Sequence, residues 1–215
     1  MWIIKRITNY FLEFVFPTRC ELCGNKNNTI CDTCIETFIR AVDTTSPSTY
    51  SHFSYKDARV RSLLQKIKYF RKLYLIEPLV HKVASDYFLR EFLADTSTSI
   101  LLSIPMTRSR IWKRGGNHTI YIAKAFSTEL SVTLHTKFLI RKKDTKQQVH
   151  THSKKERLSN IKNAFTVDEK YLSEVRGKNI ILIDDVTTTG ATIQEAINVL
   201  RKHGFKNIKA ITLAH

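Results

Sequence analysis

Hydrophobic positions along the C-terminal three quarters of the chain follow two different patterns. Val60, Leu63, Leu64 and Ile67 have the i, i+3, i+4, i+7 spacing of one helix face. Residues 99–104 and 180–183 are continuous apolar runs, which are typical of strands covered on both faces of a parallel sheet. The same reasoning predicts strands near 50–55, 99–104, 137–140, 164–167, 180–183 and 208–213, and helices near 60–67, 76–94, 117–130 and 190–203. Alternating strands and helices predict an α/β fold, a parallel sheet flanked by helices.

Local signals set some of the boundaries of these elements. Asn117 is a candidate N-cap for the helix at 117–130, and Gly204 is a suitable stop for the helix at 190–203. The polar stretch 44–51 predicts a linker or turn. We therefore expect two parts, a small module over 1–43 and an α/β domain over 44–215, which agrees with a length of 215 residues.

The first residues of the chain form an amphipathic pattern. Apolar residues recur at near-helical spacing over 3–14, interrupted by charged and polar side chains. A helix packed on the body of the protein and a weak contact with a membrane surface are both consistent with this pattern. We recognise no secretory signal and no apolar run of spanning length, so we expect a cytoplasmic protein.

All four cysteines lie in one short segment, Cys20, Cys23, Cys31 and Cys34. Two Cys-x2-Cys turns supply four thiolates, which is the ligand set of a structural zinc ion. Gly24 suits the special backbone conformation of such a turn. Two disulfides are the alternative, and they are disfavoured in a chain expected to stay in the cytoplasm. We therefore predict that 1–43 contains an N-terminal helix and a zinc ribbon.

The net charge and its distribution along the chain indicate which classes of partner the protein can bind. The chain carries 35 basic and 19 acidic residues, a formal net charge of +16. Basic residues concentrate in three clusters, at 59–72, 108–114 and 137–157. This basic excess favours nucleic acid, phosphorylated ligands or an anionic surface as partners, and a solvated face is the alternative explanation for any single cluster.

The most specific chemical pattern is the sequence IILIDDVTTTGATI at 180–193. An apolar strand ends in two acids and is followed by hydroxyl side chains, a glycine and a helix. Backbone amides at the start of that helix predict a phosphate site, and Gly190 allows a close approach. The two carboxylates can accept hydrogen bonds from the hydroxyls of a ribose, or they can help to hold a Mg²⁺ ion. The pattern predicts a site for a ribose 5-phosphate group that consists of Asp184, Asp185, Thr187, Thr188, Thr189, Gly190, Ala191 and Thr192.

This segment resembles the 5-phosphoribosyl-1-pyrophosphate (PRPP) motif of type I phosphoribosyltransferases. Together with the four-cysteine segment, the chain resembles the ComF family of competence proteins over almost its whole length. Further matching pieces are RSLLQKIKY at 61–69, IPMTRSRIWKRGGN at 104–117, and a Gln…Arg…Asn…Phe pattern at Gln147, Arg157, Asn160 and Phe165. The family usually has Arg-Gly-Phe-Asn-Gln where this chain has Arg-Gly-Gly-Asn-His at 114–118.

The resemblance implies a type I phosphoribosyltransferase-like domain with these roles. Asp184 and Asp185 would contact the ribose hydroxyls and Mg²⁺-bound water, and 187–192 would hold the 5-phosphate. Met106, Thr107 and Arg108 would occupy the pyrophosphate loop, and 141–157 would form a hood or flexible loop. The zinc ribbon would be a scaffold or a docking element.

Two functions follow as expectations. The first is an accessory protein of natural transformation that binds single-stranded DNA and a PRPP-like ligand and works with a helicase-like ATPase. Its basic clusters would follow the DNA backbone, and Tyr69, Phe70 and Trp112 would stack on bases unless they pack in the core. The alternative is an active phosphoribosyltransferase whose acceptor the sequence does not identify.

Overall fold

The structure is a computed structural model that describes residues 18–41, 46–142 and 163–215. The chain divides into two compact units, Met1–Phe38 and Ile39–His215. The amphipathic segment at 3–14 lies outside the described residues.

The described part of the first unit consists of turns and one short helix. A single antiparallel bridge joins Arg19 to Lys26, and α2 (Asp32–Glu36) begins directly after Cys31. The amide of Gly24 donates to the carbonyl of Cys20 at 2.9 Å, and Gly24 has a φ of +74°. This left-handed conformation favours glycine, and it folds the first cysteine pair into a tight turn, in agreement with the special backbone conformation expected at Gly24.

The second unit is built on a parallel four-stranded sheet with the strand order β1-β6-β5-β2. Its strands are β1 (Thr49–Phe53), β2 (Ser99–Ser103), β5 (Asn179–Val186) and β6 (Ile208–Ala214). The central strand β5 is apolar almost to its end, as a strand covered on both faces requires. The predicted parallel sheet flanked by helices is confirmed.

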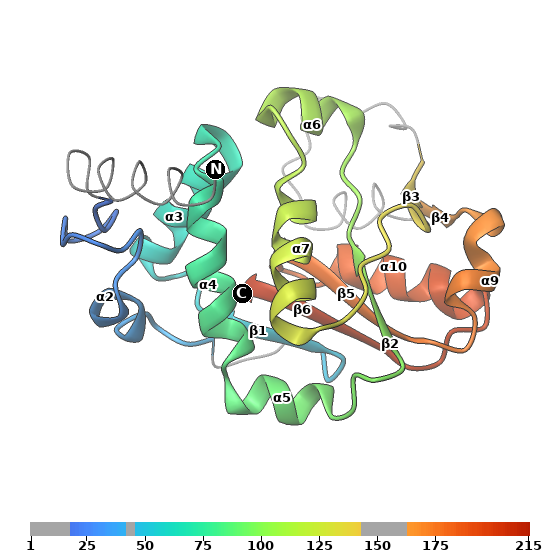
Figure 1. The fold of residues 1–215 in the computed structure, drawn as a ribbon. Coiled ribbons are helices and arrows are strands. Elements are labelled where there is room, and N and C mark those ends of the chain that lie inside the picture. Colours follow the sequence, from blue (N-terminus) through green and yellow to red (C-terminus); the bar gives the residue numbers. More distant parts are fainter. Residues whose placement is uncertain (1–17, 42–45, 143–162) are drawn as a thin grey trace, which may run out of the picture. The chain divides into compact units, whose positions relative to one another are not determined.

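Helices cover both faces of this sheet, as Figure 1 shows. On one face α10 (Ala191–Lys202) buries Ile197 and Leu200 in a core that also holds Leu102 and Leu182. On the other face lie α4 (Ile76–Ala84) and α7 (His118–Leu130), which pack against each other and against the strands. Both faces of β5 are therefore closed to water. Its polar end lies at the edge of the sheet formed by the carboxyl ends of the parallel strands.

Three elements differ from the pattern-based expectation. The helix predicted over 76–94 is two helices, α4 and α5 (Tyr87–Leu93), because the side chain of Asp86 caps α5 and starts a new helix. The strands predicted near 137–140 and 164–167 are β3 (Leu139–Arg141) and β4 (Phe165–Val167). They form a separate antiparallel pair rather than part of the parallel sheet.

The remaining elements refine the predicted boundaries. The helix predicted near 60–67 is α3 (Ala58–Phe70), and the residues from Thr49 onward belong to β1 rather than to a linker. A short helix that the pattern did not predict, α6 (Arg108–Arg114), lies between β2 and α7. Asn117 does precede α7, but its side chain makes no capping hydrogen bond. The described residues of this unit also include two short 3-10 helices, η1 (Leu73–Leu75) and η2 (Glu169–Tyr171), and the one-turn helix α9 (Leu172–Val175).

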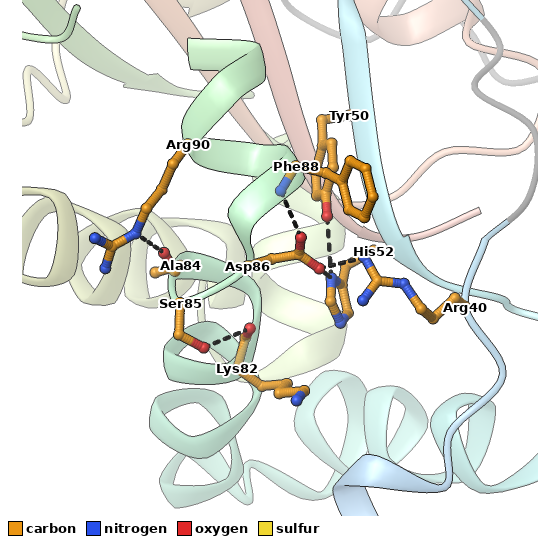
Figure 2. A network of polar contacts seen from close by, with 9 residues as sticks. All are labelled: Arg40, Tyr50, His52, Lys82, Ala84, Ser85, Asp86, Phe88 and Arg90. Atoms are coloured by element: carbon orange, nitrogen blue, oxygen red, sulfur yellow. Dashed lines mark hydrogen bonds and ion pairs between the residues drawn. The ribbon is translucent and has the colours of Figure 1, made fainter. Parts of the chain in front are cut away.

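A buried polar network ties the edge strand β1 to the start of α5 (Figure 2). Nδ1 of His52 lies 2.9 Å from a carboxylate oxygen of Asp86 and 3.1 Å from the hydroxyl of Tyr50. The same carboxylate pairs with Arg40 and accepts the amide of Phe88 at 2.8 Å. Burial opposes the charge of Asp86, but these donors outweigh it and lower the pKa of Asp86. The network therefore fixes a charged group inside the second unit.

Candidate functional site

The predicted acids lie at the carboxyl end of β5, at the edge where the parallel strands end. Because successive side chains of a strand point to opposite faces, Asp184 and Asp185 leave β5 on different sides. Asp185 is 7% exposed, and Asp184 is half-buried. The two carboxylates therefore have different surroundings and different partners.

Two side chains from neighbouring helices, a histidine and a lysine, contact the carboxylate of Asp185. Its Oδ2 lies 2.5 Å from Nε2 of His118, on α7, and 3.0 Å from Nζ of Lys68, on α3. Burial by itself would raise the pKa of Asp185, but the His118 hydrogen bond and the charge of Lys68 outweigh it and lower the pKa to about 2. Asp185 is therefore charged at neutral pH.

At Asp184 the effects that raise the pKa outweigh those that lower it. Burial and the neighbouring charge of Asp185 raise the pKa of Asp184 to about 7. The amide of Asp185 donates to the Asp184 carboxylate at 2.9 Å, which only partly opposes this shift. The site thus combines one permanently charged acid with one that changes its charge near neutrality.

Neither Lys68 nor His118 was predicted as a site residue. Lys68 follows Leu64 by four residues, so it continues the inward face of α3, and this spacing could have identified it. His118 occupies the position where the ComF family usually has glutamine. Its burial and its contact with Asp185 show that this difference lies at the site.

The segment after the acids turns at a glycine directly before the helix α10. Gly190 precedes α10 with a φ of +71°, a left-handed conformation that favours glycine. Thr188 and Thr189 are exposed, and the first amides of α10 have no carbonyl within the helix to bond. Thr187 differs, because it is buried and its amide donates to the carbonyl of Ala214 at 3.0 Å. Ala191 and Thr192 form the half-buried first residues of the helix.

The segment predicted as the pyrophosphate loop follows the neighbouring strand. β2 pairs with β5 so that Ser103 lies opposite Ile183, which places 104–107 next to the acids at the same edge. Thr107 is buried and caps α6, accepting the amide of Arg110 at 3.3 Å. Arg108 is exposed and Met106 is half-buried. The pyrophosphate-loop role of this segment stays a prediction, and the capping bond occupies the hydroxyl of Thr107.

The predicted hood or flexible loop at 141–157 falls mostly outside the described residues, as do Gln147, Arg157 and Asn160. Its first residue, Arg141, is described, and its guanidinium lies 5.2 Å from the centre of the Phe165 ring. Phe165 is buried in β4. The charge of Arg141 also acts on Asp184, where it favours the ionised form.

Two of the basic clusters meet on one exposed surface. We call it the α3–α6 surface and define it by Tyr69, Arg71 and Arg114, which lie where the two helices meet. The guanidinium of Arg114 lies 5.5 Å from the centre of the Tyr69 ring. Tyr69, Phe70 and Trp112 are 59%, 72% and 85% exposed, so core packing does not explain any of these rings. The surface presents an aromatic ring and arginines together.

The four cysteines of the first unit form one cluster. Their Sγ atoms all lie within 4.8 Å of one another, and those of Cys23 and Cys31 are 3.6 Å apart. Thiolates in a tetrahedral zinc site with Zn–S bonds of about 2.3 Å are separated by about 3.8 Å, so the spacing fits that ion. The amide of Cys31 donates to Sγ of Cys20 at 3.4 Å. The cluster is therefore positioned to bind a metal ion and is compatible with structural zinc.

Within the described ranges, no helix is both long enough and apolar enough to cross a membrane.

Comparisons with known proteins agree with this geometry. Residues 117–215, which include α7, the acids and the α10 segment, match the family model of the phosphoribosyl transferase domain. A stretch of 114 residues is 32% identical to competence protein F of Haemophilus influenzae and covers 53% of this chain and 49% of that protein. A stretch of 104 residues is 31% identical to DNA utilization protein YhgH of Escherichia coli (strain K12), with coverages of 48% and 44%.

The chain therefore spans about half the length of the curated relatives it matches. The resemblance predicted from the motifs is confirmed to this extent: the chain has homologues among these competence and DNA utilization proteins over about half of its length, and residues 117–215 match the phosphoribosyl transferase domain.

Solved structures give a weaker likeness. Adenine phosphoribosyltransferase from Leishmania donovani overlaps with a TM-score of 0.40 at 14% identity, over 80% of this chain and 85% of that chain. Glutamine PRPP amidotransferase from B. subtilis overlaps with a TM-score of 0.43 at 12% identity, over 69% of this chain and 30% of that chain.

Proposed function

We propose that this chain is a cytoplasmic accessory protein of natural transformation that binds single-stranded DNA and a PRPP-like ligand. The names of its relatives, competence protein F and DNA utilization protein, support the biological role. The observation that carries the proposal is the position of the α3–α6 surface next to the acids, because Lys68 of the same helix α3 pairs with Asp185. One unit thus offers a nucleic-acid surface and a phosphoribosyl site.

The PRPP-like ligand would lie at the edge of the sheet. The start of α10, with Thr188, Thr189 and Gly190, would hold the 5-phosphate through backbone amides and hydroxyls. The carboxylates of Asp184 and Asp185 would accept hydrogen bonds from the ribose hydroxyls. Their oxygens would also serve as ligands to a Mg²⁺ ion or accept hydrogen bonds from its bound water. This ion would neutralise negative charge on the pyrophosphate.

Single-stranded DNA would bind on the α3–α6 surface. Arginines there attract the phosphates, and the exposed rings of Tyr69, Phe70 and Trp112 offer platforms for bases. Stacking on aromatic rings contributes about 1–3 kcal/mol per base and tolerates any sequence. Binding of this kind suits a protein that receives DNA of arbitrary sequence.

The partners of the complete system are part of the same proposal. A helicase-like competence ATPase would hand the strand to this protein. The zinc ribbon of Cys20, Cys23, Cys31 and Cys34 would serve as a scaffold or as the element that docks on that partner.

The DNA-binding proposal is tested by fluorescence anisotropy with a labelled oligonucleotide over a range of salt concentrations. We expect the affinity to fall steeply as salt rises, with a logarithmic slope of about −0.7 for each phosphate contacted. Tyr69→Ala and Trp112→Ala should weaken binding and leave the slope unchanged, while Tyr87→Ala, an equally exposed ring on α5, should have no effect. Affinity that does not depend on salt, or no binding at low salt, would contradict the proposal.

An active phosphoribosyltransferase is the second candidate, supported by the paired acids next to the phosphate segment. Stabilisation of the leaving pyrophosphate and of the cationic sugar would supply most of the catalysis. The test is incubation with PRPP, Mg²⁺ and a panel of nucleobases and amines while pyrophosphate is assayed. Acceptor-dependent release would favour the enzyme, and no release together with tight DNA binding would favour the accessory protein.

A further inference from the structure

A small hollow lies between the end of α3 and the start of α7, on the inner side of the α3–α6 surface. Arg71, Arg114 and His118 line it, together with the backbone of Gly115 and the ring of Tyr121. The apolar side chains of Ile67 and Leu73 also line it. The hollow therefore joins two arginines and an imidazole in one small concave space.

Local geometry sets the position of Arg71. It ends α3 in a left-handed conformation with a φ of +54°, and its side chain lies across Gly115. A Cβ on Gly115 would approach Cδ of Arg71 to 3.1 Å, so the missing side chain of this glycine leaves the room that Arg71 occupies. Within the described residues, no carboxylate forms an ion pair with Arg71. Its guanidinium is thus held in place with its donors available.

The donors of Arg114 are also available, because His118 does not use them. Nε2 of His118 lies 2.5 Å from Asp185 and 3.3 Å from Nη1 of Arg114. A single ring nitrogen cannot donate to the carboxylate and accept from the guanidinium at once. Nε2–H of His118 donates to the charged carboxylate of Asp185, so this nitrogen does not accept a hydrogen bond from Arg114. Nδ1 of His118 is buried and has no partner within the described residues.

The charge around the hollow is positive. Asp185, the acid in contact with His118, is already paired with Lys68 at 3.0 Å. Two exposed rings lie close to the arginines. The ring of Tyr69, 59% exposed, is 5.5 Å from the guanidinium of Arg114, and Tyr121, 44% exposed, lines the hollow. An anion in the hollow would therefore lie next to aromatic platforms.

We propose that the hollow binds the terminal 5′-phosphate of a single strand, with the first base on a neighbouring ring. This inference rests on the proposed binding of single-stranded DNA and adds that the protein recognises the end of the strand. Two guanidinium groups match the double charge of a phosphomonoester better than the single charge of an internal phosphodiester. A small concave site also suits a chain end, because an internal phosphate has to carry a strand away on both sides.

The test compares oligonucleotides of about eight thymidines, within the usual site size for single strands. They carry a 5′-phosphate, a 5′-hydroxyl or a 3′-phosphate, and the label is at the opposite end or internal. With the full-length, zinc-loaded protein we expect the 5′-phosphate to tighten binding roughly tenfold over the 5′-hydroxyl, from charge-assisted hydrogen bonds. A 3′-phosphate should give no such gain.

Variants assign the effect to the hollow. Arg71→Gln and Arg114→Gln should remove the preference for the 5′-phosphate, and Gly115→Ala should reduce it by displacing Arg71. Arg201→Gln, an exposed arginine on α10, is the charge-matched control and should keep the preference. Thermal unfolding confirms that each variant is folded. Inorganic phosphate, compared with chloride at equal ionic strength, should erase the preference in the unmodified protein.

The outcomes are distinct. Equal affinity for 5′-phosphate and 5′-hydroxyl strands would overturn the end-recognition inference and leave DNA binding in place. An equal gain from a 3′-phosphate would also overturn it, because added charge alone would then explain the gain. Failure to bind any oligonucleotide would contradict the proposed function and this inference with it.

Discussion

Nε2 of His118, at the start of α7, lies 2.5 Å from a carboxylate oxygen of Asp185, at the end of β5. The two residues are 67 positions apart in the chain, and both are more than nine-tenths buried. Lys68 approaches the same oxygen at 3.0 Å. This contact decides which of the two adjacent acids is always charged.

His118→Ala should destabilise the protein by about 1–3 kcal/mol, because it removes a hydrogen-bond donor from Oδ2 of a buried carboxylate and leaves Lys68 as the remaining side-chain partner of that oxygen. His118→Gln, the residue usual in the family, should recover most of the loss because its amide can donate to Asp185. Urea unfolding measures both changes. Equal stability of His118→Ala and the unmodified protein would contradict the role given to this contact.

Asp184→Asn and Asp185→Asn together should weaken the binding of PRPP with Mg²⁺ at least tenfold, since both acceptors for the ribose hydroxyls lose their charge. Isothermal titration calorimetry measures the change, and Glu91→Gln, an exposed acid on α5, is the control. Unchanged binding by the double variant would reject the assignment of the acids to the ligand.

The pH dependence of PRPP binding should follow Asp184. Its pKa is raised to about 7, so the carboxylate is protonated below that pH and charged above it. Binding through the charged form should therefore strengthen as the pH rises through about 7 and weaken as it falls. In Asp184→Asn this pH-dependent component should disappear, while Asp185 stays charged because its pKa is lowered to about 2.

Asp86→Asn should destabilise the second unit by about 2–4 kcal/mol, because His52 is buried and loses a charged partner. The lowered pKa of Asp86 means that its stabilising contribution is complete above the unfolded value of 3.8 and is lost as the pH falls through the folded value. The difference in stability between the two proteins should therefore shrink in acid. A difference that grows as the pH falls would contradict this account.

Each chain should carry one zinc ion, held by Cys20, Cys23, Cys31 and Cys34. Elemental analysis of protein with intact thiols measures the content, and much less than one equivalent would reject the site. A chelator should unfold the first unit, since so short a segment has little core of its own. The sheet of the second unit should keep its circular dichroism.

Sequence pattern predicted the strands of the sheet well, because β5 and β2 are apolar runs whose burial on both faces leaves few alternatives. It predicted the helix break at 85–86 poorly. The apolar spacing continues through that point, and only the capping contact of Asp86 with the amide of Phe88 interrupts it. The pairing of β3 with β4 was also beyond the pattern, because spacing along one strand carries no information on its partner.

The sequence by itself determined the chemistry that this protein carries. The four clustered cysteines and the Asp184–Asp185 pair each lie within a few residues, so spacing alone describes them. Tertiary structure decided which distant side chains contact these residues. Lys68 and His118 meet Asp185, and Arg71 meets Gly115, only because helices distant in sequence converge at one edge of the sheet. Burial and charge at such contacts depend on distances in space, and these follow from packing rather than from order along the chain.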